Sequence, residues 1–255
     1  MTARTAVVLG ASRGIGLACA QQLAADGRRV VLFARDAARL DAACAAIGPL
    51  AVAARGDLAR PDDLQSLFTR VEKDFGGCDV LVNNHGGPAA GQVLALTDAD
   101  WQDAFTTFAL PVFRAIRHVV PSMQARRWGR VITIASLSVK QPIDDLDLSN
   151  FVRAGLAGVH RTLARRVAAD GINVHMVCPG SILTERSRQR ISDRAAATGI
   201  SFEEALRGSE ARIPARRLGS ADDVGQLVAF LASDRASYLT GNVIQVDGGM
   251  YSGLS

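Results

Sequence analysis

Ser149 and Arg153 lie four residues apart in the segment LSNFVRAG, at a spacing that could support chemistry. The residues around them follow a helical pattern, and positions i and i+4 share one face of a helix. A serine hydroxyl is a far weaker acid than a tyrosine phenol, whose pKa is about 10, and an arginine keeps its proton at working pH. The pair can therefore polarise a carbonyl or bind an oxyanion, but it is a poor general acid.

A glycine-rich loop near the N-terminus is a second candidate site. Gly10, Gly14 and Gly16 separate a short apolar run from a helical stretch in the segment VVLGASRGIGLA. Glycines are needed where a chain turns tightly and where its backbone approaches a pyrophosphate, and the N-terminus of the following helix attracts the anion. The place of this loop, between the first strand and the first helix, favours dinucleotide binding over a simple structural turn.

The end of the second apolar run predicts which dinucleotide binds. An acidic residue there would bind the ribose 2′-hydroxyl of NAD(H), whereas an arginine favours the 2′-phosphate of NADP(H). Arg35 comes first, Asp36 follows it, and Arg13 lies in the glycine loop. Two guanidinium groups can clamp a phosphate by forked hydrogen bonds, so we expect NADP(H). The alternative is NAD(H), with Asp36 on the ribose.

Apolar runs and helical stretches alternate along the chain. The expected strands are short and rich in Val and Ile, at residues 5–10, 28–34, 50–56, 78–84, 129–136, 172–180 and 242–249. The expected helices are amphipathic, at residues 15–26, 36–47, 61–75, 101–126, 149–170 and 221–233. This alternation predicts an α/β fold with a doubly wound parallel sheet, a Rossmann-type three-layer α/β/α sandwich, in a single domain. Residues 184–219 break the rhythm, and we expect a helical insertion there, on the substrate side.

Composition narrows the function classes. The chain has 255 residues, 48% of them hydrophobic, a formal net charge of +4 and four scattered cysteines. No apolar run approaches the roughly 20 residues of a membrane span, and no cysteine or histidine spacing suggests a metal site. The densest basic run, RSRQRISDR, contains an Asp and is interpreted as solvated surface, so no nucleic-acid partner is expected. The N-terminus has no signal-peptide pattern, and the isolated thiols are typical of a reducing compartment, so the cytoplasm is the expected location.

Further motifs then extend the pattern. They are LGASRGIG with Leu9 where Thr is usual, GDL at residues 56–58, NNHG at residues 83–86, PG at residues 179–180, and SYLTGNVIQVDGG. Together they resemble the short-chain dehydrogenase/reductase family, especially its 3-oxoacyl-carrier-protein-reductase-like branch, over nearly the whole chain. The resemblance implies cofactor contacts from Gly10, Ser12, Arg13, Gly14, Ile15, Gly16, Arg35, Asp57, Leu58, Asn84, Gly86, Pro179, Gly180, Ile182 and Thr184.

The catalytic positions depart from the family's Asn, Ser, Tyr and Lys. The resemblance places Phe108 at the Asn position, Ser136 at the Ser position, and Ser149 and Arg153 at the Tyr and Lys positions. The only tyrosines and lysines are Tyr238, Tyr251, Lys73 and Lys140, and no pair among them has the required spacing. The expected catalytic residues are therefore Ser136, Ser149 and Arg153.

Other groups could supply a proton. His85 lies where the family's backbone runs beside the cofactor, and an imidazole pKa suits proton transfer. Lys140 follows Ser136 on the same loop, and acids at positions 144, 145 and 147 could rim the pocket. Each also has a plainer interpretation, as a packed histidine, a solvated lysine or solvated acids.

The sequence leaves three functions open. The first is an NADP(H)-dependent oxidoreductase for a carbonyl/alcohol or imine/amine pair of a small-molecule substrate, with atypical proton delivery. The alternative is a catalytically impaired nucleotide-binding pseudoenzyme or regulatory subunit, which the missing Tyr and Lys favour. Redox-neutral lyase or isomerase chemistry is the third. The resemblance also implies a homo-oligomer, a tetramer or a dimer, paired through the helices at residues 101–126 and 149–170.

Overall fold

Seven parallel strands form the central sheet of this computed structural model, which describes residues 3–254. The strand order is β3-β2-β1-β4-β5-β6-β9, and every pairing is parallel. The strands are β1 (Thr5–Leu9), β2 (Arg29–Ala34), β3 (Ala51–Arg55), β4 (Val80–Asn83), β5 (Gly129–Ile134), β6 (Ile172–Pro179) and β9 (Val243–Val246). All seven predicted strands are confirmed, because their near-continuous apolar runs are those of strands covered on both faces.

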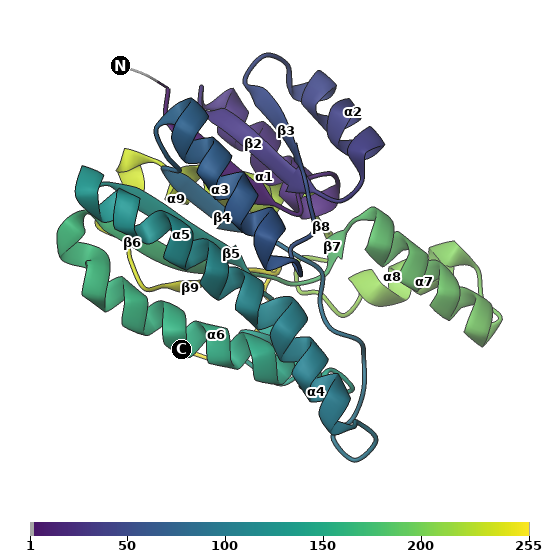
Figure 1. Cartoon of the computed structure of the whole chain (residues 1–255). Coiled ribbons are helices and arrows are strands. Elements are labelled where there is room, and N and C mark those ends of the chain that lie inside the picture. The colour runs from purple at the N-terminus through teal and green to yellow at the C-terminus, as the bar shows by residue number, and fades with distance from the viewer. Residues whose placement is uncertain (1–2, 255) are drawn as a thin grey trace.

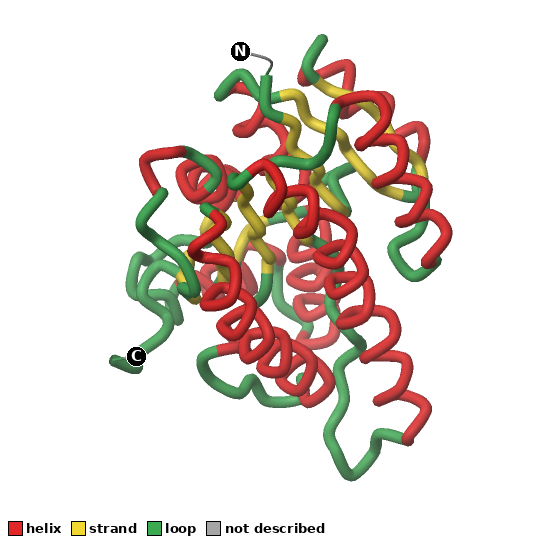
Figure 2. Tube along the Cα trace, turned by 60° about the vertical axis from the view of Figure 1, so that its left-hand side comes forward, coloured by secondary structure: helices red, strands yellow, loops and turns green. Residues whose placement is uncertain are grey.

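Helices cover both faces of the sheet (Figures 1 and 2). One face packs against α3 (Pro61–Phe75), α5 (Leu110–Arg126) and α6 (Asp147–Val167). The other packs against α1 (Gly14–Ala25), α2 (Ala37–Ile47) and α9 (Ala221–Leu231). The predicted doubly wound α/β/α sandwich in a single domain is confirmed.

Alternation along β1 shows how one strand serves two cores. Val7 and Leu9 belong to the core beneath α3, α5 and α6, whereas Ala6 and Val8 belong to the core beneath α1 and α9. Successive side chains of a strand point to opposite faces, so each strand joins both layers. The rigid sheet places the carboxyl ends of β1, β4, β5 and β6 side by side, where ligands bind in open α/β folds.

Two predicted helices differ from the structure at their ends. The one expected at residues 101–126 begins earlier, as α4 (Asp98–Ala104), because Thr97 and Asp100 form a capping box. A π-helical turn, Phe105–Ala109, joins α4 to α5, and such turns are frequent at functional sites. The helix expected from residue 149 begins two residues earlier, and its last turn is the 3-10 helix Ala168–Asp170.

The segment between β6 and α9 leaves the sheet and returns to the same place. It begins at β7 (Ile182–Leu183), continues through α7 (Glu185–Thr198) and α8 (Phe202–Glu210), and returns at β8 (Gly219–Ser220), which pairs with β7. Thr184 and Ser201 cap the two helices with capping boxes. A small apolar cluster of Ile191, Ala195 and Ala205 joins them, and Figure 1 shows the pair projecting from the side of the sheet.

No helix within residues 3–254 is long and apolar enough to span a bilayer. Within the same residues, no group of three or more His, Cys, Asp or Glu side chains is arranged to hold a metal ion.

Candidate functional site

A cavity of about 660 Å³ lies at the carboxyl ends of β1 to β4. Its walls include the predicted cofactor residues Gly10, Ser12, Arg13, Arg35, Asp57, Leu58 and Gly86. Gly10 has φ +61°, and a Cβ there would lie 2.5 Å from the backbone oxygen of Asn84, so only glycine fits the turn. Gly14 and Gly16 do not line the cavity; a Cβ on Gly16 would meet the backbone of Gly10, so its role is close packing of α1.

The N-terminus of α1 opens toward this cavity without a side-chain cap. Its N-cap residue is Arg13, whose guanidinium only donates hydrogen bonds and so does not cap the helix. The first N–H groups of a helix need partners, and together with the helix dipole they favour an anion. The glycine loop and the uncapped helix therefore form a site that fits a pyrophosphate.

Three arginines surround the outer part of the cavity. The Arg13 and Arg39 Nη1 atoms each lie 2.9 Å from Oε2 of Glu185, at the start of α7. The Arg35 guanidinium is largely exposed and lies 3.7 Å from Oδ2 of Asp57. Hydrogen bonds from Arg39 and Arg13 lower the pKa of Glu185 to about 2, so this carboxylate is ionised throughout the neutral range.

Arg39 was missed by the sequence analysis. Asp36, which precedes α2, caps that helix by accepting a hydrogen bond from the Arg39 amide at 3.0 Å. The cap places Arg39 in the first turn, one turn beyond Arg35, so both can reach the same region. The available signal was the Asp36 cap itself, because an Asp before a helical run fixes where its first turn begins.

A second cavity, of about 520 Å³, adjoins the first and shares His85, Gly86 and Gly87 with it. Its walls include the other predicted site residues: Ser136, Ser149, Arg153, Ile15, Asn84, Pro179, Gly180, Ile182 and Thr184. They lie on α1 and α6, at the carboxyl ends of β4, β5 and β6, and on β7 and the N-cap of α7, segments far apart in the sequence that meet at one edge of the sheet. Side chains from α7 close the far wall.

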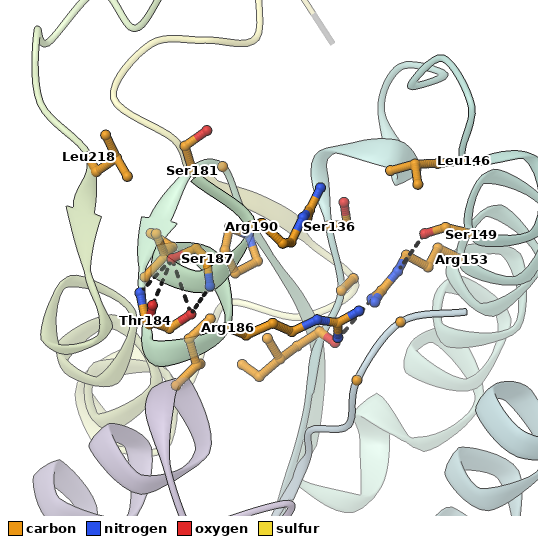
Figure 3. Close-up of a pocket in the computed structure, with 18 of the residues that line it drawn as sticks. Ser136, Leu146, Ser149, Arg153, Ser181, Thr184, Arg186, Ser187, Arg190 and Leu218 are labelled. Atoms are coloured by element: carbon orange, nitrogen blue, oxygen red, sulfur yellow. Dashed lines mark hydrogen bonds between the residues drawn. The ribbon is translucent and has the colours of Figure 1, made fainter. Parts of the chain in front are cut away.

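Ser149 and Arg153 form a hydrogen-bonded pair at the base of this second cavity (Figure 3). Arg153 Nε donates to Ser149 Oγ at 3.0 Å, and Arg153 Nη1 lies 3.5 Å from the carbonyl oxygen of Ile134. Ser138 Oγ lies 3.4 Å from Ser149 Oγ, and the Ser136 hydroxyl accepts a hydrogen bond from the Ser138 amide at 3.2 Å. The Ser138 and Ser149 hydroxyls therefore lead to the guanidinium, and Ser136 joins them only through the backbone amide of Ser138.

Arg153 is a buried cation without an acidic partner among the described residues. The pKa of Arg153 is lowered to about 10, chiefly by burial, with a smaller raising effect from Cys178 and a lowering effect from the nearby Arg186. The guanidinium stays charged at neutral pH. It therefore presents a fixed positive charge to whatever occupies the cavity.

His85 lies between the two cavities beside Phe108. The ring centroids are 5.5 Å apart, and His85 Nδ1 lies 2.7 Å from the carbonyl oxygen of Gly86. Burial, and then the Arg153 charge, lower the pKa of His85 to about 4. At neutral pH the imidazole is uncharged, so His85 does not act there as an imidazolium acid. Phe108 belongs to the π-helical turn before α5.

The remaining candidates for proton donation lie elsewhere. Lys140 lines a different hollow and lies 5.9 Å from the centre of the Tyr251 ring. Asp145 accepts a hydrogen bond from Gln92, and Asp147 accepts one from the Val93 amide at 2.8 Å. These acids hold the loop before α4 against α6, and neither lines the second cavity.

Comparison with known proteins places these features in a family. Residues 10–251 match a family model described as Enoyl-(Acyl carrier protein) reductase. The chain is 36% identical over 250 residues to 3-oxoacyl-[acyl-carrier-protein] reductase FabG of Escherichia coli (strain K12), with 97% of each chain covered.

Solved structures agree with this. YwfH, an NADPH-dependent reductase involved in bacilysin biosynthesis, superposes with a TM-score of 0.94 at 29% identity, covering 99% of this chain and 100% of that one. L-Sorbose reductase from Gluconobacter frateurii, complexed with NADPH and L-sorbose, gives 0.94 at 32% identity, covering 100% and 98%.

Proposed function

Because the chain belongs to the short-chain dehydrogenase/reductase family, we propose that it is an NADP(H)-dependent oxidoreductase acting on a carbonyl/alcohol or imine/amine pair. The observation that carries this proposal is the junction of the two cavities at residues 85–87. One cavity has the features of a dinucleotide site, and the other holds Ser136, Ser149 and Arg153. A nicotinamide at the junction would face those three side chains.

The cofactor assignment rests on the arginines and on the glycine loop. The uncapped N-terminus of α1 fits the pyrophosphate, and Arg13, Arg35 and Arg39 fit the 2′-phosphate that distinguishes NADP(H) from NAD(H). Asp36, the residue that would favour NAD(H), is engaged as the cap of α2. YwfH is an NADPH-dependent reductase and the L-sorbose reductase was solved with NADPH, which supports the same assignment.

When bound, the reduced nicotinamide supplies a hydride, which carries both electrons of the reduction. The chain's own residues position the substrate carbonyl and stabilise the negative charge that develops on its oxygen. Arg153 provides a fixed charge for that oxygen, and the Ser149 and Ser136 hydroxyls provide donors. The reaction also needs one proton at the oxygen to give the alcohol.

We infer that this proton comes from the solvent: a water at the developing alkoxide gives up a proton, and the hydroxide left behind is released to bulk water. By the family resemblance, Ser149 and Arg153 occupy the positions of the family's Tyr and Lys. A serine hydroxyl is no stronger an acid than water, Arg153 keeps its proton at neutral pH, and His85 is uncharged there, so none of the three replaces the phenol. The charge of Arg153 and the Ser136 and Ser149 hydroxyls would hold such a water, and proton delivery would be slower than from a phenol.

A nucleotide-binding pseudoenzyme is the alternative, and one observation favours it. No tyrosine or lysine lines either cavity within the described residues. Such a protein would bind NADPH without oxidising it, whatever carbonyl compound is offered.

We also propose that the protein is a homo-oligomer, a tetramer or a dimer, paired through α4, α5 and α6. Phe105, Phe151 and Val159 are exposed on these helices. A Cβ on Gly155 or Gly158 would meet nothing within 4 Å, so a second helix can approach this surface closely.

Two measurements on the same protein test this proposal, one of cofactor binding and one of turnover. Fluorescence titration measures the affinity for NADPH and NADH, and absorbance at 340 nm follows NADPH oxidation with 3-oxoacyl esters, quinones and keto acids. We expect tighter NADPH binding, and turnover with at least one class that falls in Ser136→Ala by roughly 10²-fold or more. Ser192→Ala, an exposed serine on α7, is the matched control. Tight NADPH binding without turnover of any compound would favour the pseudoenzyme.

A further inference from the structure

The second cavity contains a concentration of positive charge that the proposed reaction does not explain. Its lining includes five arginines, and no Asp or Glu within the described residues: Arg153, Arg186, Arg190, Arg194 and Arg212. The formal net charge of the whole chain is +4. These arginines therefore exceed the net charge of the protein, so its basic character is concentrated at this site.

None of the five forms an ion pair with a described residue. Some arginines elsewhere are paired with acids, as Arg13 and Arg39 are paired with Glu185. By contrast, Arg194 donates to the carbonyl oxygen of Ala205 at 2.7 Å and to the Ser209 hydroxyl at 2.6 Å, both neutral acceptors. Arg153 is buried, whereas the other four are exposed and hydrated, so together they create a positive potential in the cavity that favours an anion.

The arginines of α7 line one side of the cavity because of their spacing. Arg186, Arg190 and Arg194 follow one another at intervals of four residues, so they share one face of the helix. Like charges at this spacing destabilise an isolated helix. The sequence analysis interpreted this run as solvated surface because it contains an Asp. Periodicity shows which residues share a face, but not what that face contacts.

Two guanidinium groups from different elements meet at the junction of the cavities. A Cβ on Gly86 would lie 3.2 Å from Arg186 Nη1, and a Cβ on Gly87 would lie 3.5 Å from Arg153 Nη2. Figure 3 shows Arg186 and Arg190 extending from α7 toward Ser136 and Arg153. The fold thus holds several cations around the point where a reacting carbonyl would lie.

We propose that the substrate is a small carbonyl compound that carries at least one oxyanion, a carboxylate or a phosphate, held by Arg153, Arg186 and Arg190. The proposal rests on the proposed reductase function and names its substrate class. Planar guanidinium groups bind the paired oxygens of carboxylates and phosphates by forked hydrogen bonds. A neutral ketone of the same size would leave the buried charge of Arg153 uncompensated.

Binding of simple anions tests the charge site separately from turnover. Oxalate and inorganic phosphate are titrated by calorimetry into protein saturated with NADP⁺, comparing wild type with the double variant Arg186→Gln and Arg190→Gln. We expect affinity for at least one anion to fall about 10-fold or more in the double variant. Arg188→Gln is the matched control, because Arg188 lies on α7 over the Phe202 ring and outside the cavity. It should leave affinity within about 2-fold of wild type, since Arg188 does not line the cavity and its charge is screened by solvent.

Turnover then identifies the source of the oxyanion. NADPH oxidation is compared for 2-oxo acids and their methyl esters, and for dihydroxyacetone phosphate and dihydroxyacetone. A preference for either anionic partner, lost in the double variant but not in Arg188→Gln, supports the proposal and distinguishes carboxylate from phosphate.

Three results would overturn this inference. The first is equal turnover of anionic and neutral partners, and the second is anion affinity that Arg188→Gln lowers as much as the double variant does. The third is anion binding that disappears once NADP⁺ is bound, which would assign these arginines to the cofactor. Equal turnover, or loss of anion binding in the presence of NADP⁺, leaves the reductase proposal intact. Failure of the protein to bind NADPH at all would contradict the reductase proposal, and the anion titrations would then test only the charge site.

Discussion

Replacing Arg153 by methionine should make the unliganded protein more stable. Arg153 is buried on α6, and burial is the largest cause of the fall of its pKa to about 10. The pKa of the folded protein is thus below that of the unfolded chain, so at any pH below about 10 the folded state holds this charge at a penalty. A depression of roughly two pKa units or more corresponds to about 3 kcal/mol.

The net effect is smaller because two hydrogen bonds disappear with the guanidinium. Those to Ser149 Oγ, at 3.0 Å, and to the Ile134 carbonyl oxygen, at 3.5 Å, contribute about 1 kcal/mol each. Ser149 keeps a neighbour in the Ser138 hydroxyl at 3.4 Å. Arg153→Met should therefore gain about 1 kcal/mol, which raises Tm by about 2–4 °C in a chain of this size.

An anion should reverse this order. A ligand that binds only the folded state at about 100 times its Kd adds about 2.7 kcal/mol, so saturating oxalate or phosphate should leave wild type the more stable protein. Calorimetric melting at pH 7 in a dilute buffer without polyvalent anions, then with each anion, makes the measurement. Arg165→Met, which removes an exposed charge from the same helix, is the control and should show neither change. An Arg153→Met protein that melts below wild type in both conditions would refute this account of an uncompensated buried charge.

Four further outcomes follow from the same structure. Arg39→Ala should weaken NADPH binding about 10-fold and leave NADH binding unchanged. Glu185→Gln, which frees Arg13 and Arg39, should tighten NADPH binding. Fluorescence titration measures both affinities, and an equal response of NADPH and NADH would contradict this prediction. The plot of kcat/KM against pH should be level from pH 6 to 9, because the pKa values of His85 and Arg153 are about 4 and 10. Above that range kcat/KM should fall as Arg153 loses its charge. An inflection near pH 6.5 would indicate a titrating histidine instead. The double variant Ser149→Tyr and Arg153→Lys should reduce neutral 3-oxoacyl esters faster than wild type, and an unchanged rate would show that the missing phenol is not what limits proton delivery. Light scattering should give a tetramer or dimer that Val159→Arg dissociates, since Val159 is exposed on α6, whereas a wild-type monomer at micromolar concentration would rule out the pairing.

The layers of the fold were predictable because their cause is local. Apolar runs such as those at residues 5–10 and 172–180 can be satisfied only by strands covered on both faces, and the helical stretches between them fix the parallel order. Boundaries were less predictable where capping decided them. The start of α4 depended on a capping box formed by Thr97 and Asp100, which the apolar periodicity does not reveal.

The candidate site was also predictable only in part from the sequence. The glycine loop and the pair formed by Ser149 and Arg153 could be recognised because their spacing along one turn or one helix determines their geometry. The Glu185 ion pairs with Arg13 and Arg39 could not, because they join segments about 150 residues or more apart. The depressed pKa of His85 depends on burial and on a charge from α6, and neither is visible in the sequence NNHG.

Transfer of deuterium from labelled NADPH tests the central claim most directly. The protein is incubated with NADPH deuterated at the reactive C4 position and with each 2-oxo acid and phosphate-bearing ketone, and the products are analysed by mass spectrometry. We predict deuterium on the new carbinol carbon of at least one product, with a rate that falls by roughly 10²-fold or more in Arg153→Gln and not in Arg188→Gln. Stoichiometric NADPH binding without deuterium in any product, or transfer that Arg153→Gln does not slow, would contradict the assignment of this site as the reductase centre.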